Sequence, residues 1–169
     1  MHFYFDVGHR GVHDSCDFLI FHLLESGEHQ KFALLMLDID HFKKINDTHG
    51  HLVGDEAIRH VARRAVQTLR TTDVVARYGG EEFVVFLPGE DLDGAAQAAE
   101  RLREAVREPF VPGGLADVAL TVTVSVGVTA FRPSATDVSA LLGEADQALY
   151  RSKQGGRNRV TVFSKGESK

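Results

Sequence analysis

A turn of four residues, Gly79-Gly80-Glu81-Glu82, separates two stretches that both have the composition of β-strands. The first stretch covers residues 74–78 and the second covers residues 83–87. Two strand-like runs separated by a few residues that include glycine are typical of a β-hairpin, so the two strands are expected to pair antiparallel. The hairpin therefore predicts that the chain folds around a largely antiparallel sheet.

Three further strands are predicted outside the hairpin. Residues 32–37 (FALLML) are continuously apolar and are followed by charged residues, which is typical of a central, buried strand. Residues 121–128 (TVTVSVGV) alternate valine with small or polar side chains, so one face of this strand is expected to be buried. Residues 159–163 form a short closing strand.

Apolar residues recur at helical spacing in three segments. A long amphipathic helix is predicted over residues 57–69, a second over residues 92–106, and a last one from Asp137, its expected N-cap, to Lys153. Helices before and after an antiparallel hairpin indicate an α+β fold, with a central, mainly antiparallel sheet flanked by helices.

The size and composition fit one structural domain. The chain has 169 residues, of which 43% are hydrophobic and 25% are charged. Its net charge of −5 gives no general attraction to nucleic acid, so phosphate binding must come from a few placed groups. No apolar run approaches the roughly 20 residues that a membrane span needs. No signal peptide opens the sequence and Cys16 is its one cysteine, so a cytoplasmic location is expected.

Acidic residues occur at the ends of two predicted strands. Asp38 and Asp40 follow the apolar run and share one face, and Glu81 and Glu82 lie at the tip of the hairpin. The glycines before them would allow positive φ and the close approach of a ligand. If the hairpin lies beside the apolar strand, three or four carboxylates converge, and packed anions require a cation such as Mg²⁺.

Each acidic feature also has an ordinary structural interpretation. An Asp at a strand end is usually a solvated turn residue, and a Gly-Gly-Glu-Glu hairpin can be only a turn. Their occurrence together in one domain favours function, because an acidic cluster beside a central sheet otherwise only costs stability.

Four motifs in order carry a resemblance to a known family. They are LDIDHFKKINDTHGHLVGDEAIRHVA from Leu37, RYGGEEFVVFLPG from Arg77, TVTVSVGVT from Thr121 and EADQALYRSKQGGRNRV from Glu144. Together they resemble the GGDEF family of diguanylate cyclases over about residues 32–162, with GGEEF as an accepted form of the signature. The resemblance implies the condensation of two GTP into cyclic di-GMP with release of two pyrophosphates. It also implies a five-stranded sheet akin to the polymerase palm and the class III nucleotidyl cyclases.

The resemblance assigns a metal and a catalytic role to the acidic residues. Asp38, Glu81 and the carbonyl of Ile39 match the ligands of Mg²⁺ (or Mn²⁺), and Glu82 matches a second signature acid implicated in catalysis beside Asp38 and Glu81. The family pattern leaves the role of Asp40 open.

Substrate contacts follow from the same motifs. Asn46 and Asp55 match the residues that read guanine, whereas Asn46 on its own would more often be a helix cap. Lys43, Lys153 and Arg157 match phosphate contacts, although Lys153 and Arg157 alone would pass as a solvated helix end. Phe42 and Lys43 are also expected to present backbone N–H groups to phosphate at a helix start.

A second site is implied away from the acidic residues. Arg70, Asp73 and Arg101 match a site at which bound cyclic di-GMP inhibits the enzyme. The resemblance also implies that the enzyme works as a homodimer. An Arg and an Asp three residues apart at a helix end commonly form only a weak surface pair, so this interpretation stays open as well.

The N-terminal region departs from the family. Residues 5–21 (FDVGHRGVHDSCDFLIF) do not match the DxLTGLxNRR segment that usually opens the domain, although Asp14 is positioned to cap a first helix that ends at Gly27. We expect a divergent segment over residues 1–31, the GGDEF catalytic domain over residues 32–163 and a tail over residues 164–169.

Two functions remain open at this point. The first is an active cyclase, and the second is a catalytically silent domain that acts as a cyclic di-GMP receptor or scaffold. An adenylyl cyclase or similar nucleotidyl transferase is disfavoured by Asn46 and Asp55.

Overall fold

A computed structural model describes residues 4–5, 31–113, 115, 118–132 and 138–164 of the chain. Its strands form one six-stranded sheet in the order β1-β3-β4-β2-β5-β6. The helix predicted to begin at Asp14 lies outside the described residues.

The centre of the sheet is antiparallel. Strand β2 (Phe32–Ile39) lies between β4 (Glu82–Pro88) and β5 (Val124–Ala130) and pairs antiparallel with both. All eight residues of β2 are buried, as the continuous apolar run predicts. Strand β3 (Val74–Arg77) pairs antiparallel with β4, which confirms the predicted hairpin.

The two edges of the sheet are parallel. Strand β6 (Val160–Val162) runs parallel to β5, and β1 (Tyr4–Phe5) runs parallel to β3. The predicted α+β class with a mainly antiparallel five-stranded sheet is confirmed for β3, β4, β2, β5 and β6. Strand β1 is an addition that the sequence did not predict, because two residues are too few to show an alternating pattern.

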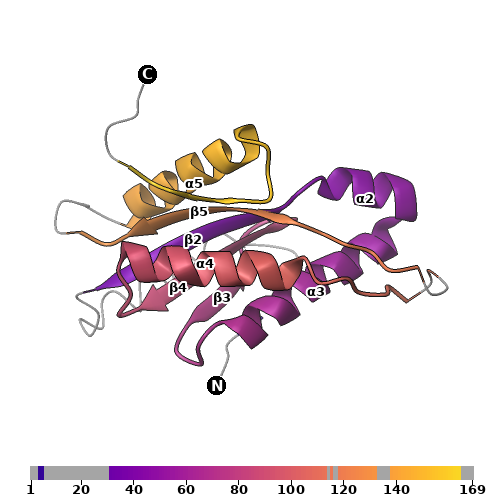
Figure 1. Ribbon diagram of the computed structural model, residues 1–169, viewed down its shortest axis with the longest axis horizontal. Helices are drawn as coiled ribbons and strands as arrows, with labels where there is room; N and C mark the ends of the chain where they lie inside the picture. Colours follow the sequence, from indigo (N-terminus) through magenta and orange to yellow (C-terminus); the bar gives the residue numbers. More distant parts are fainter. Residues whose placement is uncertain (1–3, 6–30, 114, 116–117, 133–137, 165–169) are drawn as a thin grey trace.

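Helices cover both faces of the sheet (Figure 1). Helices α3 (His51–Thr68) and α4 (Leu92–Val106) pack on the face that carries Leu35 and Leu37, in a core that includes Val61 and Leu102. Helix α5 (Val138–Gln154) covers the other face, where Leu34 and Met36 meet Leu149 and other apolar residues. The three-layer arrangement buries both faces of β2, which explains why its sequence is apolar throughout.

Helix α5 lies unusually close to the sheet at Gly127 of β5. A Cβ atom at this position would lie 2.1 Å from the carbonyl oxygen of Ala145 and 2.3 Å from the nitrogen of Leu149. Because both atoms belong to the backbone of α5, the glycine is what allows this helix to contact the strand directly.

Helix α2 (Phe42–His49) connects β2 to α3 at one end of the molecule (Figure 1). Gly50, with a φ of 86°, separates α2 from α3, so the predicted helix over residues 57–69 begins six residues earlier, at His51. Strand β5 begins at Val124, three residues later than predicted.

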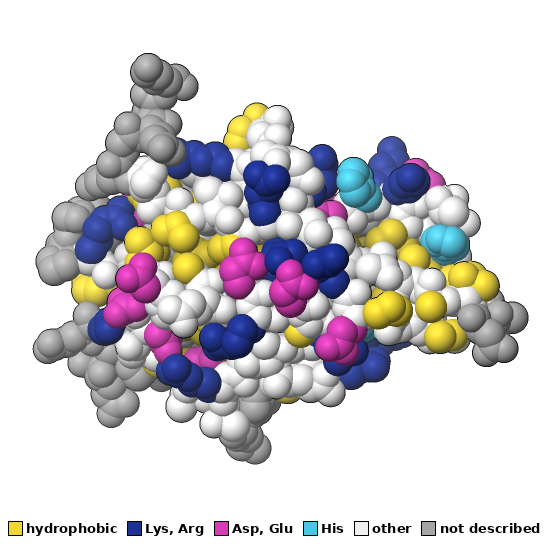
Figure 2. Space-filling view, viewed as in Figure 1, with side chains coloured by type: hydrophobic (Ala, Val, Ile, Leu, Met, Phe, Trp, Pro, Cys, Tyr) yellow, Lys and Arg dark blue, Asp and Glu magenta, His cyan; other side chains and the backbone are white. Residues whose placement is uncertain are grey.

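The exposed surface of α4 mixes charges of both signs, as Figure 2 shows over this helix. Arg103 forms ion pairs with Glu100 and Glu104, and Arg107 forms another with Glu104. None of the described helices has both the length and the apolar character that crossing a membrane requires.

Candidate active site

A row of three polar residues crosses the centre of the sheet. Glu82 of β4 and Ser125 of β5 are the partners of Asp38 in β2, one on each side. Directly opposed residues of antiparallel strands point to the same face. The row therefore lies on the face that α5 covers, at the end of β2 from which the chain leaves the sheet.

Asp38 is held by a lysine of α5. Its side chain is nearly buried, and its Oδ2 lies 2.8 Å from Nζ of Lys153. Burial raises the pKa of Asp38, while the hydrogen bond and the positive charge of Lys153 act in the opposite direction. Lys153 is therefore the counter-cation of a nearly buried carboxylate, and it opposes the rise in pKa that burial causes.

Glu81 lies next to Asp38 through the backbone. The N–H of Ile39 donates to the carbonyl of Glu81 at 3.3 Å, which joins the end of β2 to the start of β4. Burial raises the pKa of the Glu81 carboxyl, and repulsion from Asp38 and then from Glu82 raises it further. Two carboxylates that repel each other in this way form a site with affinity for a cation.

The predicted acidic residues lie within electrostatic range of one another, but they do not form a ready cage for a metal ion. Among the residues that the structure describes, no three His, Cys, Asp or Glu side chains are arranged to hold a metal ion. Asp40 is engaged by hydroxyl and backbone donors, and Glu82 lines a pocket, which leaves Asp38 and Glu81 as the candidate pair of carboxylate ligands.

Two carboxylates and the Ile39 carbonyl still fit Mg²⁺. This ion usually keeps several waters and takes one or two carboxylates together with phosphate oxygens of a substrate, rather than a complete cage of protein ligands. Burial is the main cause of the raised pKa values of Asp38 and Glu81, and for Glu81 repulsion from Asp38 adds to it, which a bound cation would offset.

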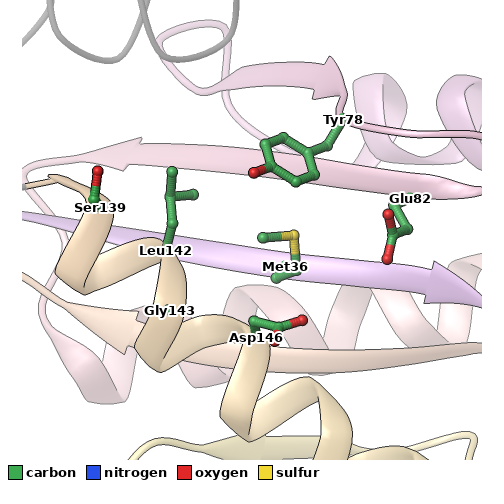
Figure 3. Close-up of a pocket in the computed structure, with 7 residues that line it drawn as sticks. All are labelled: Met36, Tyr78, Glu82, Ser139, Leu142, Gly143 and Asp146. Carbon is green, nitrogen blue, oxygen red and sulfur yellow. The ribbon is translucent and has the colours of Figure 1, made fainter. Parts of the chain in front are cut away.

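The pocket beside Glu82 has a volume of about 290 Å³ (Figure 3). Glu82 and Met36 line it from the sheet, Tyr78 from the segment between β3 and β4, and Asp146 and other residues from α5. Glu82 thus lines a pocket on the same face of the sheet as Asp38.

Gly79 and Gly80 act differently from the prediction. The positive φ that glycine would allow is not used here, because within the described part of the chain positive φ angles occur at other glycines. A Cβ atom on Gly79 would lie 2.7 Å from Oε2 of Glu82, whereas a Cβ on Gly80 would have no atom within 4 Å. Gly79 makes room for the Glu82 carboxylate, and Gly80 leaves the surface open to a ligand.

Asn46 lies in α2 and faces α3. Its Oδ1 atom is buried and has no hydrogen-bond partner among the described residues. It packs against Gly54, where a Cβ atom would lie 1.9 Å from Oδ1 and 3.3 Å from Cζ of Phe42. Asn46 is inside the helix, so the alternative that it caps one is wrong. Asp55, exposed on the next residue of α3, completes a pair of polar groups at this corner.

The start of α2 has the character of an anion site. His41, with a φ of 58°, precedes the helix and makes no side-chain cap hydrogen bond. The first N–H groups of α2, which include those of Phe42 and Lys43, have no capping side chain, and the helix dipole adds positive potential there. The side chain of Lys43 is exposed beside them.

Two more basic residues come from the C-terminal motif. Lys153 contacts Asp38 directly, and the positive charge of Arg157 also lowers the pKa of Asp38, which places it within electrostatic range. Both therefore lie on the side of the sheet that carries the acidic pair, rather than at an unrelated helix end.

The Arg70 and Asp73 motif does not form the simple side-chain pair that its spacing suggests. Asp73 is buried, and its Oδ2 accepts from the backbone N–H of Arg70 at 2.7 Å. The guanidinium of Arg70 instead forms an ion pair of 2.5 Å with Glu90, a residue that the sequence did not single out. The positive charge of Arg101 acts on Asp73, so Arg101 lies within electrostatic range of this motif.

The comparisons with known proteins agree with the fold and the motifs. Residues 19–159 match the family model described as "Diguanylate cyclase, GGDEF domain". The chain therefore belongs to the GGDEF family of diguanylate cyclase domains.

Curated relatives share close to half of their residues with the chain over the matched region. Diguanylate cyclase A of Treponema denticola is 42% identical over 138 residues, which cover 81% of this chain and 37% of that protein. Diguanylate cyclase DgcP of Pseudomonas aeruginosa is 47% identical over 130 residues, which cover 76% of this chain and 19% of that protein. The chain thus spans less than two-fifths of the length of either relative.

Solved structures show the same arrangement of elements. The GGDEF domain of DgcB from Caulobacter crescentus, determined in complex with c-di-GMP, has a TM-score of 0.78 and 37% identity, covering 90% of this chain and 85% of that chain. The active GGEEF domain of a diguanylate cyclase from Vibrio cholerae has a TM-score of 0.75 and 29% identity, covering 89% of this chain and 92% of that chain.

Proposed function

We propose that the protein is a diguanylate cyclase that condenses two GTP molecules into cyclic di-GMP and releases two pyrophosphates. The observation that carries this proposal is the pair of carboxylates, Asp38 and Glu81, at the joined ends of β2 and β4, with Nζ of Lys153 at 2.8 Å from Asp38. The uncapped start of α2, four residues beyond Asp38, supports it, because triphosphate oxygens need both cationic and N–H partners.

Asp38, Glu81 and the carbonyl of Ile39 would hold Mg²⁺ or Mn²⁺. When bound, the ion neutralises the charge of the triphosphate and stabilises the charge that develops during the transfer. Within the chain, the ion pair with Lys153 favours the charged form of Asp38, which is the form that binds a metal ion.

The reaction is a phosphoryl-type transfer in which the chain contributes no nucleophile. The 3′-hydroxyl oxygen of one GTP attacks the α-phosphorus of the other, the bond from that phosphorus to pyrophosphate breaks, and the same exchange in the opposite direction closes the ring. Lys43, Lys153, Arg157 and the N–H groups at Phe42 and Lys43 orient the phosphates. Glu82, which lies opposite Asp38 on the same face of the sheet, would assist removal of the hydroxyl proton.

Guanine is recognised by Asn46 and Asp55. The buried Oδ1 of Asn46 is an acceptor with no hydrogen-bond partner among the described residues, and Asp55 is exposed directly after Gly54, against which Asn46 packs. Guanine offers donors at N1 and at its exocyclic amine, whereas adenine lacks this arrangement. GTP should therefore be strongly preferred over ATP.

Two protomers are needed for one product, because each acidic site holds one GTP. The enzyme would act as a homodimer with the two sites facing each other. Product bound at Arg70, Asp73 and Arg101 would then inhibit the enzyme by disfavouring this arrangement. A cytoplasmic location stays a prediction from the sequence.

Incubation with GTP and Mg²⁺, followed by analysis of the products, tests the proposal. Asp38→Ala should abolish formation of cyclic di-GMP, while Asp93→Ala, which removes an exposed acid on α4, should leave it intact. Binding of cyclic di-GMP without any turnover of GTP would instead identify a receptor or scaffold, and normal turnover by Asp38→Ala would overturn the metal assignment.

A further inference from the structure

Asp40, two residues beyond Asp38, is a buried carboxylate with a complete set of hydrogen bonds. Its Oδ1 accepts from Oγ of Ser125 at 2.6 Å, and its Oδ2 accepts from Oγ1 of Thr123 at 2.7 Å and from the backbone N–H of Asn158 at 2.9 Å. Only 5% of the residue is exposed. A carboxylate engaged by three donors is committed to holding protein groups in place.

The backbone that Asp40 holds is a left-handed turn. Gly156, Arg157 and Asn158 have φ angles of 111°, 62° and 46°. Two of them are not glycine, and each such residue costs about 1–2 kcal/mol in this conformation, so the surroundings must maintain the turn. Besides Asp40, the N–H of Arg157 donates to the carbonyl of Ser152 at 3.0 Å, and Arg103 donates to Oδ1 of Asn158 at 2.8 Å.

The turn carries Arg157 and follows directly after α5, which carries Lys153. Lys153 already contacts Asp38, and Arg157 is exposed within electrostatic range of Asp38. Asp40, which directly follows β2, therefore links this end of the strand to the turn that carries Arg157. The link spans 118 residues of sequence and attaches next to Arg157.

We propose that Asp40 is a positioning residue: through the N–H of Asn158 it fixes the turn so that the Arg157 guanidinium faces the substrate phosphates. This inference rests on the proposed function, because it takes Arg157 as a phosphate contact. It gives Asp40 a role that is separate from the metal and from the chemistry of the transfer.

A double-mutant cycle tests the proposal. The affinity of GTP carrying a methylene bridge between its α- and β-phosphorus atoms is measured by calorimetry with Mg²⁺, because this analogue binds without reacting at the α-phosphorus. Asp40→Ala and Arg157→Ala should each weaken binding by about tenfold or more, the effect of losing one charge-assisted contact. The double variant should bind no more weakly than Arg157→Ala, since both changes remove the same contact.

Two further variants separate positioning from general stability. Asp40→Asn should bind nearly as the unaltered protein does, because its Oδ1 can accept from Thr123 and Asn158 while its amide donates to the hydroxyl of Ser125. Thr123→Val removes a hydrogen bond from the same carboxylate but leaves the Asn158 contact, so it should lower the melting temperature without weakening binding.

The proposal would be overturned if the decreases in affinity for the analogue caused by Asp40→Ala and Arg157→Ala add up in the double variant. It would also be overturned if Asp40→Ala binds the analogue as the unaltered protein does. If Asp40→Ala does not fold, amide exchange of the unaltered protein decides, and rapid exchange of the Asn158 N–H would overturn it equally. Binding of the analogue without production of cyclic di-GMP from GTP would refute the proposed catalysis while leaving this test intact.

Discussion

The contact between Asn46 and Gly54 shows how a single missing side chain shapes a site. Glycine inside a helix normally costs about 1 kcal/mol relative to alanine, and α3 accepts this cost in its first turn. In return, Oδ1 of Asn46 occupies the space of the absent Cβ atom, where it has no hydrogen-bond partner among the described residues. The glycine is explained by the position of the asparagine rather than by the backbone of α3.

Replacing Gly54 by alanine should therefore separate stability from function. The new Cβ would lie 1.9 Å from Oδ1 of Asn46, so the amide must move away from the position proposed to read guanine. We expect GTP to bind about tenfold more weakly and its preference over ATP to narrow, since a buried hydrogen bond to the base is lost. Binding of both nucleotides is measured by calorimetry.

Gly143→Ala on α5 is the matched control, because a Cβ at this position meets no atom within 4 Å. It should raise the melting temperature slightly and leave the preference for GTP over ATP unchanged. A Gly54→Ala variant that retains full selectivity would contradict the role assigned to Asn46.

At the scale of elements, the sequence predicted what depends on periodicity. The apolar run at residues 32–37 predicted β2, and the hairpin around Gly79 and Gly80 predicted β3 and β4. These predictions succeeded because a strand face must be apolar to be buried, and this requirement is visible in the sequence. Strand β1 was missed because its pairing with β3 is a tertiary contact between distant residues.

The candidate site was predicted only in part for the same reason. The motifs identified Asp38 and Glu81, but Asp40 contacts Thr123 and Asn158 across more than 80 residues, and the ion pair of Arg70 with Glu90 spans two elements. The local sequence around Asp40 and around Arg70 contains no pattern that indicates these partners. Side-chain direction at the end of a strand is decided by the neighbours that the fold supplies.

Helices α3 and α4 are joined by a buried histidine. His60 is 3% exposed, its Nε2 lies 3.0 Å from the carbonyl of Val106, and its ring stacks on Phe110 at a centroid distance of 4.2 Å. Burial lowers the pKa of His60 from its ordinary value of 6.5, although the bond to Val106 acts in the opposite direction. The neutral ring is the form that the fold prefers.

This preference predicts a pH dependence of stability. Below pH 6.5 the unfolded chain protonates His60 before the folded chain does, so the free energy of unfolding falls as the pH drops toward the folded pKa. The contribution is fully present above pH 6.5. His60→Phe should be less stable at pH 7.5, because the Val106 carbonyl loses its donor, but should lose less stability on acidification. Urea unfolding of the unaltered protein and of His60→Phe at pH 7.5 and 5.5 measures the free energy of unfolding in each case. An equal decrease of this free energy in the two proteins on acidification would contradict the prediction.

At the scale of the whole molecule, one domain is expected to bind only one of the two GTP molecules that the proposed reaction joins. Each acidic site is expected to hold one GTP, and the two nucleotides must meet with opposite orientations to form a symmetric product. The rate per protomer should therefore rise with protein concentration until dimers predominate. Turnover measured over a dilution series, with the mass of the species followed by light scattering, tests this. A rate per protomer that stays constant in a proven monomer would refute it.

Feedback by product depends on Arg70, whose guanidinium is already engaged by Glu90. Cyclic di-GMP proposed to bind at Arg70, Asp73 and Arg101 must compete with this ion pair, in which Arg70 is exposed and Glu90 is partly buried, and which is worth about 1 kcal/mol. Arg70→Ala should weaken binding of cyclic di-GMP and relieve inhibition, while Glu90→Gln should tighten binding by up to about fivefold, because it frees the guanidinium.

The opposite directions of the two changes distinguish a product site from a structural ion pair. If the pair only stabilises the fold, both variants lower the melting temperature and neither alters the affinity for cyclic di-GMP. Arg63→Ala, which removes an exposed arginine from α3, controls for the loss of positive charge.

Because coupling between sites is reciprocal, product that disfavours the productive dimer must bind that dimer less tightly by the same factor. Calorimetric titration at protein concentrations below and above dimerisation measures this factor, and an affinity that is independent of both protein concentration and Arg70 would contradict the feedback site.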